Sequence, residues 1–549
     1  MSDVSSKSGT KHRVLIFLSL IILATGLVSY RLFRLTFLEH DSYVQAARSQ
    51  YINATEVLTG RGTIYFTDQT AEGRRILSTN KDALFVYADD REVNLADSAV
   101  KELATILEME LEELNPLLEH DTSHQLIKRD ITEGQADEIR ELGFTGIKIT
   151  SETVRYYPDG DSASHVAGFV GFDGHNRVGQ YGIEAYYDDD LSGEGEDHGS
   201  DIVLTIDPMI QQFIENKLED LVELWSAESG SVIVQDPETG AIIAMASVPA
   251  YDPNIYWESN LEDFPNPVMQ KPYEPGSTFK PFTMAAGLNT NALTPDTTYN
   301  DTGTVTIGGY KLSNFDGQAR GIQTMSDVLQ KSLNTGTIFA QKRTGNDAFL
   351  NHVVSFGFGE QTGIDLAGEA EGAISNLYSN NEVNFATASF GQGIAVTPLQ
   401  LINAYSSIAN GGKLMKPFIV KEVIHTDGTR DITEPEIIDA PIKSVVAKQL
   451  QSMLTDVADK SQMNARIEGY DVAVKTGTAQ IADPKGGYLE DEVIHNFVGF
   501  APSYAPEFVV MIKLDRPVGV RYAASSLAGP FTEITRFLLN YYNIPPTRI

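Results

Sequence analysis

Three short motifs, in one order and far apart, constrain this chain of 549 residues more than any other feature. The first is Ser277-Thr278-Phe279-Lys280, which directly follows Pro275-Gly276. The second is Ser332-Leu333-Asn334, and the third is Lys475-Thr476-Gly477-Thr478. Alone, such motifs are typical of a helix cap, a helix end and a strand that ends at a turn. Because three of them in one order are much harder to meet by accident, we interpret them as parts of one site.

The first motif places a nucleophile beside a possible base. Apolar residues recur at helical spacing from Phe279 onward, which predicts a helix that carries Ser277. Residues three positions apart share a helix face, with about 5 to 6 Å between their Cβ atoms, so we expect Lys280 beside the Ser277 hydroxyl. A serine needs an adjacent base, and a lysine serves only if burial or a second cation lowers its pKa. Lys475 is a candidate for that second cation.

The third motif has the alternation of a strand. In residues 472–478, Lys475 and Gly477 are expected on one face, and Thr476 and Thr478 on the other. A glycine at position 477 leaves room for a substrate backbone to approach closely.

The second motif supplies polar groups, and other chemistries have less support. Ser332 is a candidate for passing a proton, and Asn334 for binding a substrate amide. The closest histidine pair, His120 and His124, lacks both the HExxH arrangement and further metal ligands. The chain has no cysteine, which excludes disulfides and thiolate chemistry. We therefore expect no metal and no cofactor.

The overall charge and the N-terminus indicate which partners and which cellular location to expect. A formal net charge of −34 argues against nucleic acid as a partner, because such binding depends on lysine and arginine. Residues 14–30 form an uncharged apolar run, which at about 1.5 Å per residue just spans a bilayer core. Since no good cleavage site follows this run, we predict an uncleaved anchor at residues 14–34 after a cytoplasmic tail at residues 1–13.

A membrane-proximal region is expected at residues 35–200. Within it, the patterns predict helical segments at 100–118 and 124–142 and a strand and turn at 165–171. The acidic, glycine-rich stretch 192–200 marks a domain boundary.

Residues 201–549 are expected to form a single α/β domain. Strand hairpins near both ends with helices between them indicate an antiparallel sheet covered by helices. The predicted strands are residues 201–207, 230–234, 241–248, 472–478, 496–500 and 508–514. The predicted helical segments, besides the one that carries Ser277, are residues 208–225, 327–408 and 531–542.

With these motifs the sequence resembles class B penicillin-binding proteins, which are membrane-anchored peptidoglycan transpeptidases. The resemblance covers nearly the whole chain. Further family-like stretches are Arg61–Ile64, Arg155–Pro158, Gly182–Glu184, Phe390–Gly393, Thr397–Gln400 and Phe497–Pro502. One stretch departs from the family: Tyr65–Thr70 stands where aspartate, arginine, asparagine and glycine usually follow the Arg-Gly-x-Ile motif.

This resemblance implies a serine acyl-enzyme mechanism. Ser277 would attack the carbonyl of the penultimate D-alanine of a stem peptide and expel the terminal D-alanine. Lys280 would take the serine proton, and Ser332 would help to deliver it to the leaving amine. An amine of a neighbouring stem peptide would then accept the acyl group, and β-lactams would acylate the same serine.

The resemblance also implies how the substrate is held. Asn334 would hold the substrate amide, while Lys475, Thr476 and Thr478 would engage its carboxylate. Gly477 would lie beside the substrate in the same strand. The backbone N–H groups of Ser277 and Thr478 would form the oxyanion hole.

Residues 469–502 resemble the division-type members of this family. This likeness implies a septal enzyme of the bacterial inner membrane with its catalytic domain outside the cytoplasm. Its expected partners are divisome membrane proteins and a membrane glycosyltransferase of the shape, elongation, division and sporulation family. An elongation-type transpeptidase, a serine β-lactamase, and a non-catalytic β-lactam sensor or division scaffold are the alternatives. A β-lactamase would normally lack the anchor and the region from 35 to 200, and the intact motifs argue against a silent scaffold.

Overall fold

The computed structural model describes most of the chain, in two compact units. The described residues are 60–68, 73–89, 92–119, 125–173, 176–192, 198–379, 381–483 and 485–548. The predicted tail and anchor lie outside these ranges, and no helix within them is long and apolar enough to span a bilayer. The smaller unit contains residues 82–154 and 172–177, and the larger contains residues 58–81, 155–171 and 178–549.

Three helices and a small sheet form the smaller unit. Its strands are the C-terminal part of β2 (Gly73–Ala88), β3 (Gln125–Ile131) and most of β4 (Ile147–Tyr156), and both β3 and β4 pair with β2. The helices are α3 (Asp97–Ile106), α4 (Leu111–Leu118) and α5 (Glu133–Leu142). Their apolar faces share a core with β2 and β3 that includes Val86, Leu103, Leu114, Ile127 and Ile139.

Two sequence predictions for this unit were wrong in part. The helix predicted at 100–118 is two helices, because the chain turns at Glu108, which has a φ of 51°. The helix predicted at 124–142 begins only at Glu133, since the preceding residues form β3. Pairing with β2 decides this outcome, and no signal within the segment itself reports that pairing.

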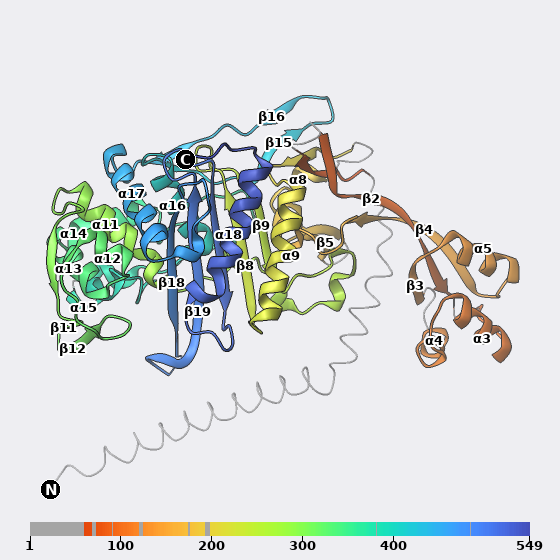
Figure 1. The fold of residues 1–549 in the computed structure, drawn as a ribbon. Helices are drawn as coiled ribbons and strands as arrows, with labels where there is room; N and C mark the ends of the chain where they lie inside the picture. The colour runs from red at the N-terminus through yellow and green to blue at the C-terminus, as the bar shows by residue number, and fades with distance from the viewer. Residues whose placement is uncertain are drawn as a thin grey trace, which may run out of the picture. The chain divides into compact units, whose positions relative to one another are not determined.

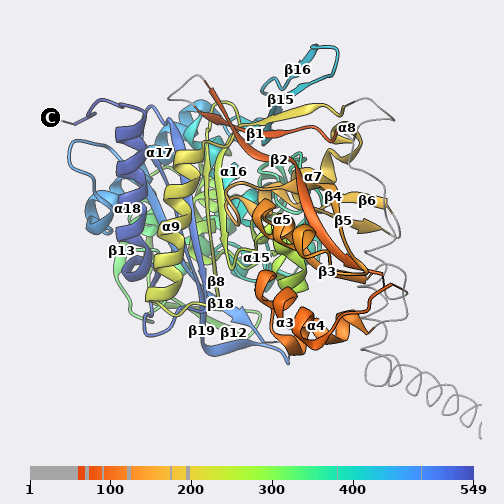
Figure 2. The same cartoon turned by 90° about the vertical axis from the view of Figure 1, so that its right-hand side faces the viewer.

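A five-stranded antiparallel sheet is the centre of the larger unit (Figures 1 and 2). Its spatial order is β18-β19-β20-β8-β9, so the last three strands of the chain continue the β8–β9 hairpin. The bounds are β8 (Ser229–Gln235), β9 (Ile242–Val248), β18 (Ala473–Ala482), β19 (Tyr488–Ala501) and β20 (Phe508–Asp515). The predicted hairpins are confirmed, although β18 and β19 are longer than predicted.

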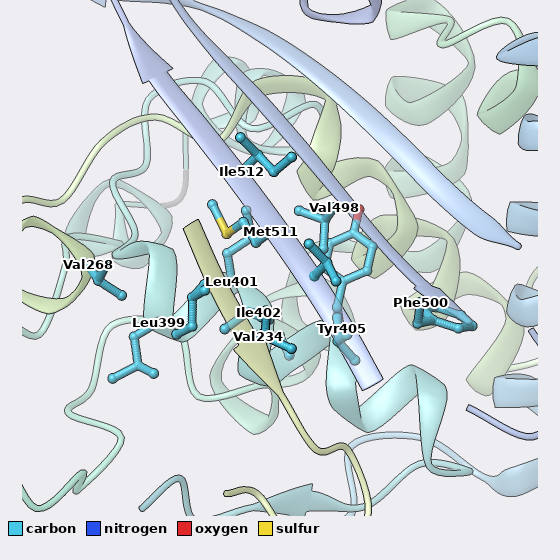
Figure 3. Packing of buried hydrophobic residues seen from close by; sticks show 14 of the residues in the cluster. Val234, Val268, Leu399, Leu401, Ile402, Tyr405, Val498, Phe500, Met511 and Ile512 are labelled. Carbon is cyan, nitrogen blue, oxygen red and sulfur yellow. The ribbon is translucent and has the colours of Figure 1, made fainter. Parts of the chain in front are cut away.

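Helices cover both faces of this sheet. On one face, α9 (Pro208–Leu224) and α18 (Ala523–Tyr541) lie side by side (Figure 1). On the other face, α16 (Pro398–Ala409) packs against β8, β19 and β20, and α17 (Ser444–Lys460) packs along β18. Figure 3 shows Leu401, Ile402 and Tyr405 of α16 among apolar side chains of these strands, so α16 is buried along its whole length. This arrangement confirms the predicted α/β fold class.

A group of helices beside α16 carries two of the three motifs. Its centre is α11 (Lys280–Asn289), of which residues 280–288 are all buried. Besides α17, the helices that pack against it are α12 (Met325–Gln330), α13 (Asn334–Thr344) and α14 (Asn346–Ser355), and α15 (Glu382–Ala388) packs against α13. Because α11 is enclosed by other helices, a charged residue at its start lies in the protein interior.

A second sheet of the larger unit has the order β16-β15-β7-β1-β2. Besides β2, its strands are β1 (Ile64–Asp68), β7 (Asp201–Leu204), β15 (Val420–Ile424) and β16 (Arg430–Ile432). The departure from the family at Tyr65 begins inside β1, which pairs in parallel with β7.

The remaining elements are short. They are α6 (Ser164–Ala167), β5 (Phe169–Asp173), β6 (Asn176–Gln180), α7 (Gly182–Tyr186), α8 (Asp188–Leu191), η2 (Pro253–Glu258), η3 (Leu261–Asp263), α10 (Pro267–Gln270), η4 (Gly276–Phe279), β10 (Thr298–Asp301), β11 (Thr304–Ile307), β12 (Tyr310–Ser313), β13 (Gly321–Thr324), η5 (Ser375–Tyr378), β14 (Leu414–Met415), β17 (Ile437–Asp439) and η6 (Met463–Ala465). The strand predicted at 165–171 thus starts as one helical turn, and the final helix begins at Ala523 rather than at 531.

Candidate active site

Ser277 lies in a single 3-10 turn that leads directly into a helix. This turn is η4, and α11 follows it from Lys280, so Ser277 stands at the start of a helical segment, as predicted. Gly276 has a φ of 57°, which favours glycine, and Pro281 occupies the first turn of α11, where a missing N–H costs nothing. Ser277 is half-buried, whereas Lys280 is fully buried one turn later.

The two motif lysines converge on the serine of the second motif. Lys280 Nζ lies 3.2 Å from Ser332 Oγ and donates to the Ser332 carbonyl oxygen at 2.6 Å. Lys475 Nζ lies 3.1 Å from the same Oγ and donates to the carbonyl of Thr476 at 3.0 Å. Ser332 has a φ of 56°, a strained conformation for a serine, which turns both of its oxygens toward Lys280.

Burial lowers the pKa of both lysines. Burial, and then the charge of Lys475, lower the pKa of Lys280 well below its ordinary value. Burial alone lowers the pKa of Lys475 to about 7. Lys280 is therefore the amine that stays neutral, and a neutral amine can take a proton from a neighbouring hydroxyl. Both amines lie within hydrogen-bonding distance of the same Ser332 hydroxyl.

The third motif lies on β18 with the predicted alternation. Lys475 and Gly477 are buried, whereas Thr476 and Thr478 are half-buried. Thr478 Oγ1 accepts a hydrogen bond from Ala523 N at 3.0 Å, so this side chain also fixes the start of α18.

Packing within the protein also requires the glycine at 477. A Cβ there would lie 2.2 Å from Asn496 Oδ1 and 2.9 Å from the Pro275 carbonyl oxygen. Protein packing therefore requires this glycine. Contacts at Pro275 hold the nucleophile turn against the sheet, because its carbonyl oxygen lies close to Gly477 and accepts from Asn496 Nδ2 at 3.1 Å.

Asn334 begins α13 beside a loop that the sequence did not single out. Its Nδ2 donates to the carbonyl oxygen of Ser313 at 2.9 Å. Two residues later in that loop, the exposed ring of Phe315 meets the exposed ring of Tyr522 edge to face, with centroids 6.0 Å apart. Tyr522 directly precedes Ala523, so the two rings join the surroundings of Asn334 to those of Thr478.

Sequence reasoning missed three supports of the nucleophile turn. The Tyr405 hydroxyl donates to the Thr278 carbonyl at 2.7 Å, and Gly391 accepts from Gly276 N at 3.0 Å through its carbonyl. Glu274 accepts from Gly393 N at 2.9 Å and from the Tyr488 hydroxyl at 3.0 Å. The family-like stretch Phe390–Gly393 was a signal for the glycines, but nothing in the sequence indicated Tyr405.

Known proteins share both the sequence and the fold. The family "Penicillin binding protein transpeptidase domain" matches residues 230–536, and the family "Penicillin-binding Protein dimerisation domain" matches residues 56–199. Stage V sporulation protein D of Bacillus subtilis is 35% identical over 486 residues, which cover 83% of this chain and 74% of that protein. Peptidoglycan D,D-transpeptidase FtsI of Escherichia coli is 27% identical over 555 residues, which cover 96% and 91%.

A solved structure agrees over most of the chain. The crystal structure of penicillin-binding protein 3 from Mycobacterium tuberculosis in complex with aztreonam has a TM-score of 0.70 at 26% identity, covering 89% of this chain and 97% of that one. The transpeptidase match spans more than half of the chain and includes all three motifs. The chain therefore belongs to the penicillin-binding protein transpeptidases, and with its dimerisation domain to the class B members of that family.

Proposed function

We infer that the chain is a peptidoglycan D,D-transpeptidase that crosslinks stem peptides through an acyl-enzyme on Ser277. The observation that carries this function is the convergence of two buried lysines on Ser332, where one of the two, Lys280, follows Ser277 by one helical turn. Such a site has a neutral amine, Lys280, to act as the base that a serine nucleophile needs.

The proposed reaction has two steps. Lys280 takes the proton of Ser277 while Ser277 Oγ bonds to the carbonyl carbon of the penultimate D-alanine. The bond to the terminal D-alanine then breaks, and its amine leaves with a proton passed through Ser332. An amine of a second stem peptide attacks the resulting ester, forms the crosslink and releases Ser277 with its proton restored.

Substrate binding is assigned to the residues around this centre. Asn334 holds the substrate amide, and Lys475 with Thr476 and Thr478 engages the terminal carboxylate. The backbone N–H groups of Ser277 and Thr478 stabilise the oxyanion, an effect often worth about 3 to 4 kcal/mol per donor. The packing of β18 against η4 supports this pairing, since a Cβ on Gly477 would lie 2.9 Å from the carbonyl oxygen of Pro275.

Intact-mass analysis of the full chain with a fluorescent penicillin tests the proposal. We expect one stable adduct in the wild type, and none in Ser277→Ala. The matched control is Ser98→Ala, because Ser98 also precedes a lysine by three residues but lies in α3. An adduct that is released rapidly would identify a β-lactamase, and the absence of any adduct on folded protein would identify a non-catalytic scaffold.

We further propose a septal role for an enzyme anchored through residues 14–34, with a pedestal at 35–200 and the transpeptidase domain at 201–549. The likeness to the FtsI protein of Escherichia coli supports this role, as does the division-type stretch 469–502. The proposed partners are divisome membrane proteins and a membrane glycosyltransferase. Depletion in the native bacterium should remove incorporation of fluorescent D-amino acids at the septum, whereas loss along the lateral wall would indicate the elongation type.

A further inference from the structure

A buried carboxylate lies behind the second motif, and the proposed reaction does not use it. Asp301, at the end of β10, is 1% exposed. Its Oδ1 accepts from Gly303 N at 2.9 Å and from Thr335 Oγ1 at 2.8 Å. Both of its oxygens lie 3.1 Å from Asn314 Nδ2. Every one of these partners donates, so the site is built for a group that only accepts hydrogen bonds.

The neighbouring amide has only one workable orientation. Asn314 is buried, and while its Nδ2 donates to Asp301, its Oδ1 accepts from Thr335 N at 3.2 Å. If the amide turned over, its oxygen would face the carboxylate and its N–H groups would face the backbone N–H of Thr335. Both contacts would then be repulsive, so Asp301 fixes the direction of the Asn314 side chain.

These contacts hold both sides of the hydrogen bond that orients Asn334. Asn334 Nδ2 donates to the carbonyl oxygen of Ser313, which directly precedes Asn314. Thr335, the other partner of Asp301, directly follows Asn334. Asp301 thus binds Asn314 and Thr335, the two residues that directly follow the partners of this hydrogen bond.

We propose that Asp301 is a positioning residue that sets the direction of the Asn334 side chain toward the substrate amide. This inference rests on the proposed function, in which Asn334 binds that amide. With one Nδ2 hydrogen engaged by Ser313, the Oδ1 and the second hydrogen of Asn334 are left to recognise an amide. Asp301 itself touches no substrate.

Replacing the Asp301 carboxylate with an amide should disturb this arrangement. Exchanging the two residues, so that position 301 carries the amide and position 314 the carboxylate, should restore it. In Asp301→Asn, one oxygen becomes an NH2 group that faces the Nδ2 donor of Asn314. In the double variant Asp301→Asn with Asn314→Asp, the amide at 301 donates to the carboxylate at 314, which still accepts from Thr335 N. The reversal keeps one of the two contacts between residues 301 and 314 at 3.1 Å, and it loses the other together with the long bond from Asn314 Nδ2 to the Gln318 carbonyl, at 3.4 Å.

The test measures binding and acylation separately for two β-lactams on the full chain. One is a penicillin, which carries a side-chain amide, and the other is a carbapenem, which carries none. We expect Asp301→Asn to slow acylation by the penicillin about tenfold or more and acylation by the carbapenem less than about threefold. Asn334→Ala should show the same selectivity, and the double variant should return to within about threefold of the wild type.

A matched control separates positioning from stability. Asp207 is also a fully buried carboxylate, but it caps α9 and accepts from Tyr541. Asp207→Asn should lower the melting temperature without changing the ratio of the two acylation rates. If Asp301→Asn does not fold, Thr335→Val removes one donor to Asp301 and should show the same selective slowing.

Two results would overturn the inference: equal slowing for both β-lactams, or a selective loss that the double variant does not rescue. A wild type that neither β-lactam acylates would instead refute the proposed function.

Discussion

Two lysine amines that share one hydroxyl dominate the site at the scale of single residues. Lys280 and Lys475 are both buried and both lie within 3.2 Å of Ser332 Oγ. Protonating both amines in the protein interior would add the repulsion between two positive charges to the cost of removing both charges from water. One of the two amines therefore has to stay neutral. This cost is what makes a lysine usable as a base, and two predictions follow from it.

The first prediction concerns the pH profile of acylation. In Lys475→Met, the pKa of Lys280 rises because one of the two causes that lower it is removed. The rising limb of the acylation rate against pH should therefore move to higher pH, and the rate at pH 7 should fall about tenfold or more. Stopped-flow acylation from pH 5 to 9 measures this. Lys217→Met, on the surface of α9, is the control. If the rising limb of the Lys475→Met profile stays at the wild-type pH, the charge of Lys475 does not lower the pKa of Lys280.

The second prediction is that the same substitution stabilises the fold. The folded pKa of Lys475, about 7, lies below the ordinary lysine pKa of 10.5. The unfolded chain therefore binds more protons between these values, and the cost of burying Lys475 decreases as the pH rises from 7 to 10.5. Lys475→Met should raise stability by on the order of a few kcal/mol at pH 6 and by less at pH 9, as measured by urea unfolding. Destabilisation at both pH values would disprove this account.

At the scale of elements, the turn that carries the nucleophile depends on two neighbours. The loop at Gly391 is one of them, because a Cβ there would lie 2.2 Å from the Gly276 carbonyl oxygen. Gly391→Ala should shift the turn and slow acylation at least about tenfold. Gly345→Ala is the matched control, since Gly345 has a similar φ of 85° but open space around it. Equal rates in the two variants would show that backbone strain, and not the clash, is responsible.

Helix α16 is the second neighbour, through a single buried hydroxyl. In Tyr405→Phe, the Thr278 carbonyl loses its hydrogen bond from Tyr405. An unsatisfied buried acceptor costs about 1 to 3 kcal/mol, so we expect that loss of stability together with slower acylation. Tyr541→Phe, which removes a hydrogen bond to Asp207, should affect stability alone. Calorimetry and acylation rates on both variants make the comparison, and a Tyr405→Phe variant that acylates at the wild-type rate would contradict it.

At the scale of the whole molecule, one buried ion cluster joins distant parts of the larger unit. Glu184 is fully buried and pairs with Arg61 at 2.7 Å and with Arg155 at 2.6 Å. Burial opposes its ionisation, but the two arginines outweigh burial and hold the pKa of Glu184 below its ordinary value. These three residues come from three family-like stretches far apart in the chain, so the cluster explains why those stretches occur together.

Glu184→Gln should destabilise the protein by about 3 to 5 kcal/mol at pH 7, because it leaves buried arginines without their counter-charge. A carboxylate whose folded pKa is lowered contributes stability that is present above its unfolded pKa and is lost as the pH falls through the folded value. The difference from the wild type should therefore shrink below the ordinary pKa of 4.5. Calorimetry from pH 3 to 7 tests this. Glu228→Gln, in an exposed pair with Arg516, should cost less than about 1 kcal/mol, and an equal cost in both variants would contradict the argument.

Local signals predicted many elements of the larger unit well. Asp207 and Pro208 mark the start of α9, and its apolar spacing continues to Leu224. The turn from Pro237 to Gly240 marks the β8–β9 hairpin. Where the sequence prediction was wrong, as at β3, the strand depends on a partner strand. The early start of α18 likewise depends on a distant contact, the hydrogen bond from Ala523 N to Thr478.

The motif residues, their order, the α/β class and the family could be predicted from the amino acids alone, because each of these depends on side-chain chemistry and spacing along the chain. Folding adds that Lys475 lies beside Ser332, that Tyr405 and Gly391 support the nucleophile turn, and that Asp301 lies behind Asn334. Burial and hydrogen bonds between distant segments set the pKa of the lysines and the direction of the asparagine. Those partners meet only when the chain has folded.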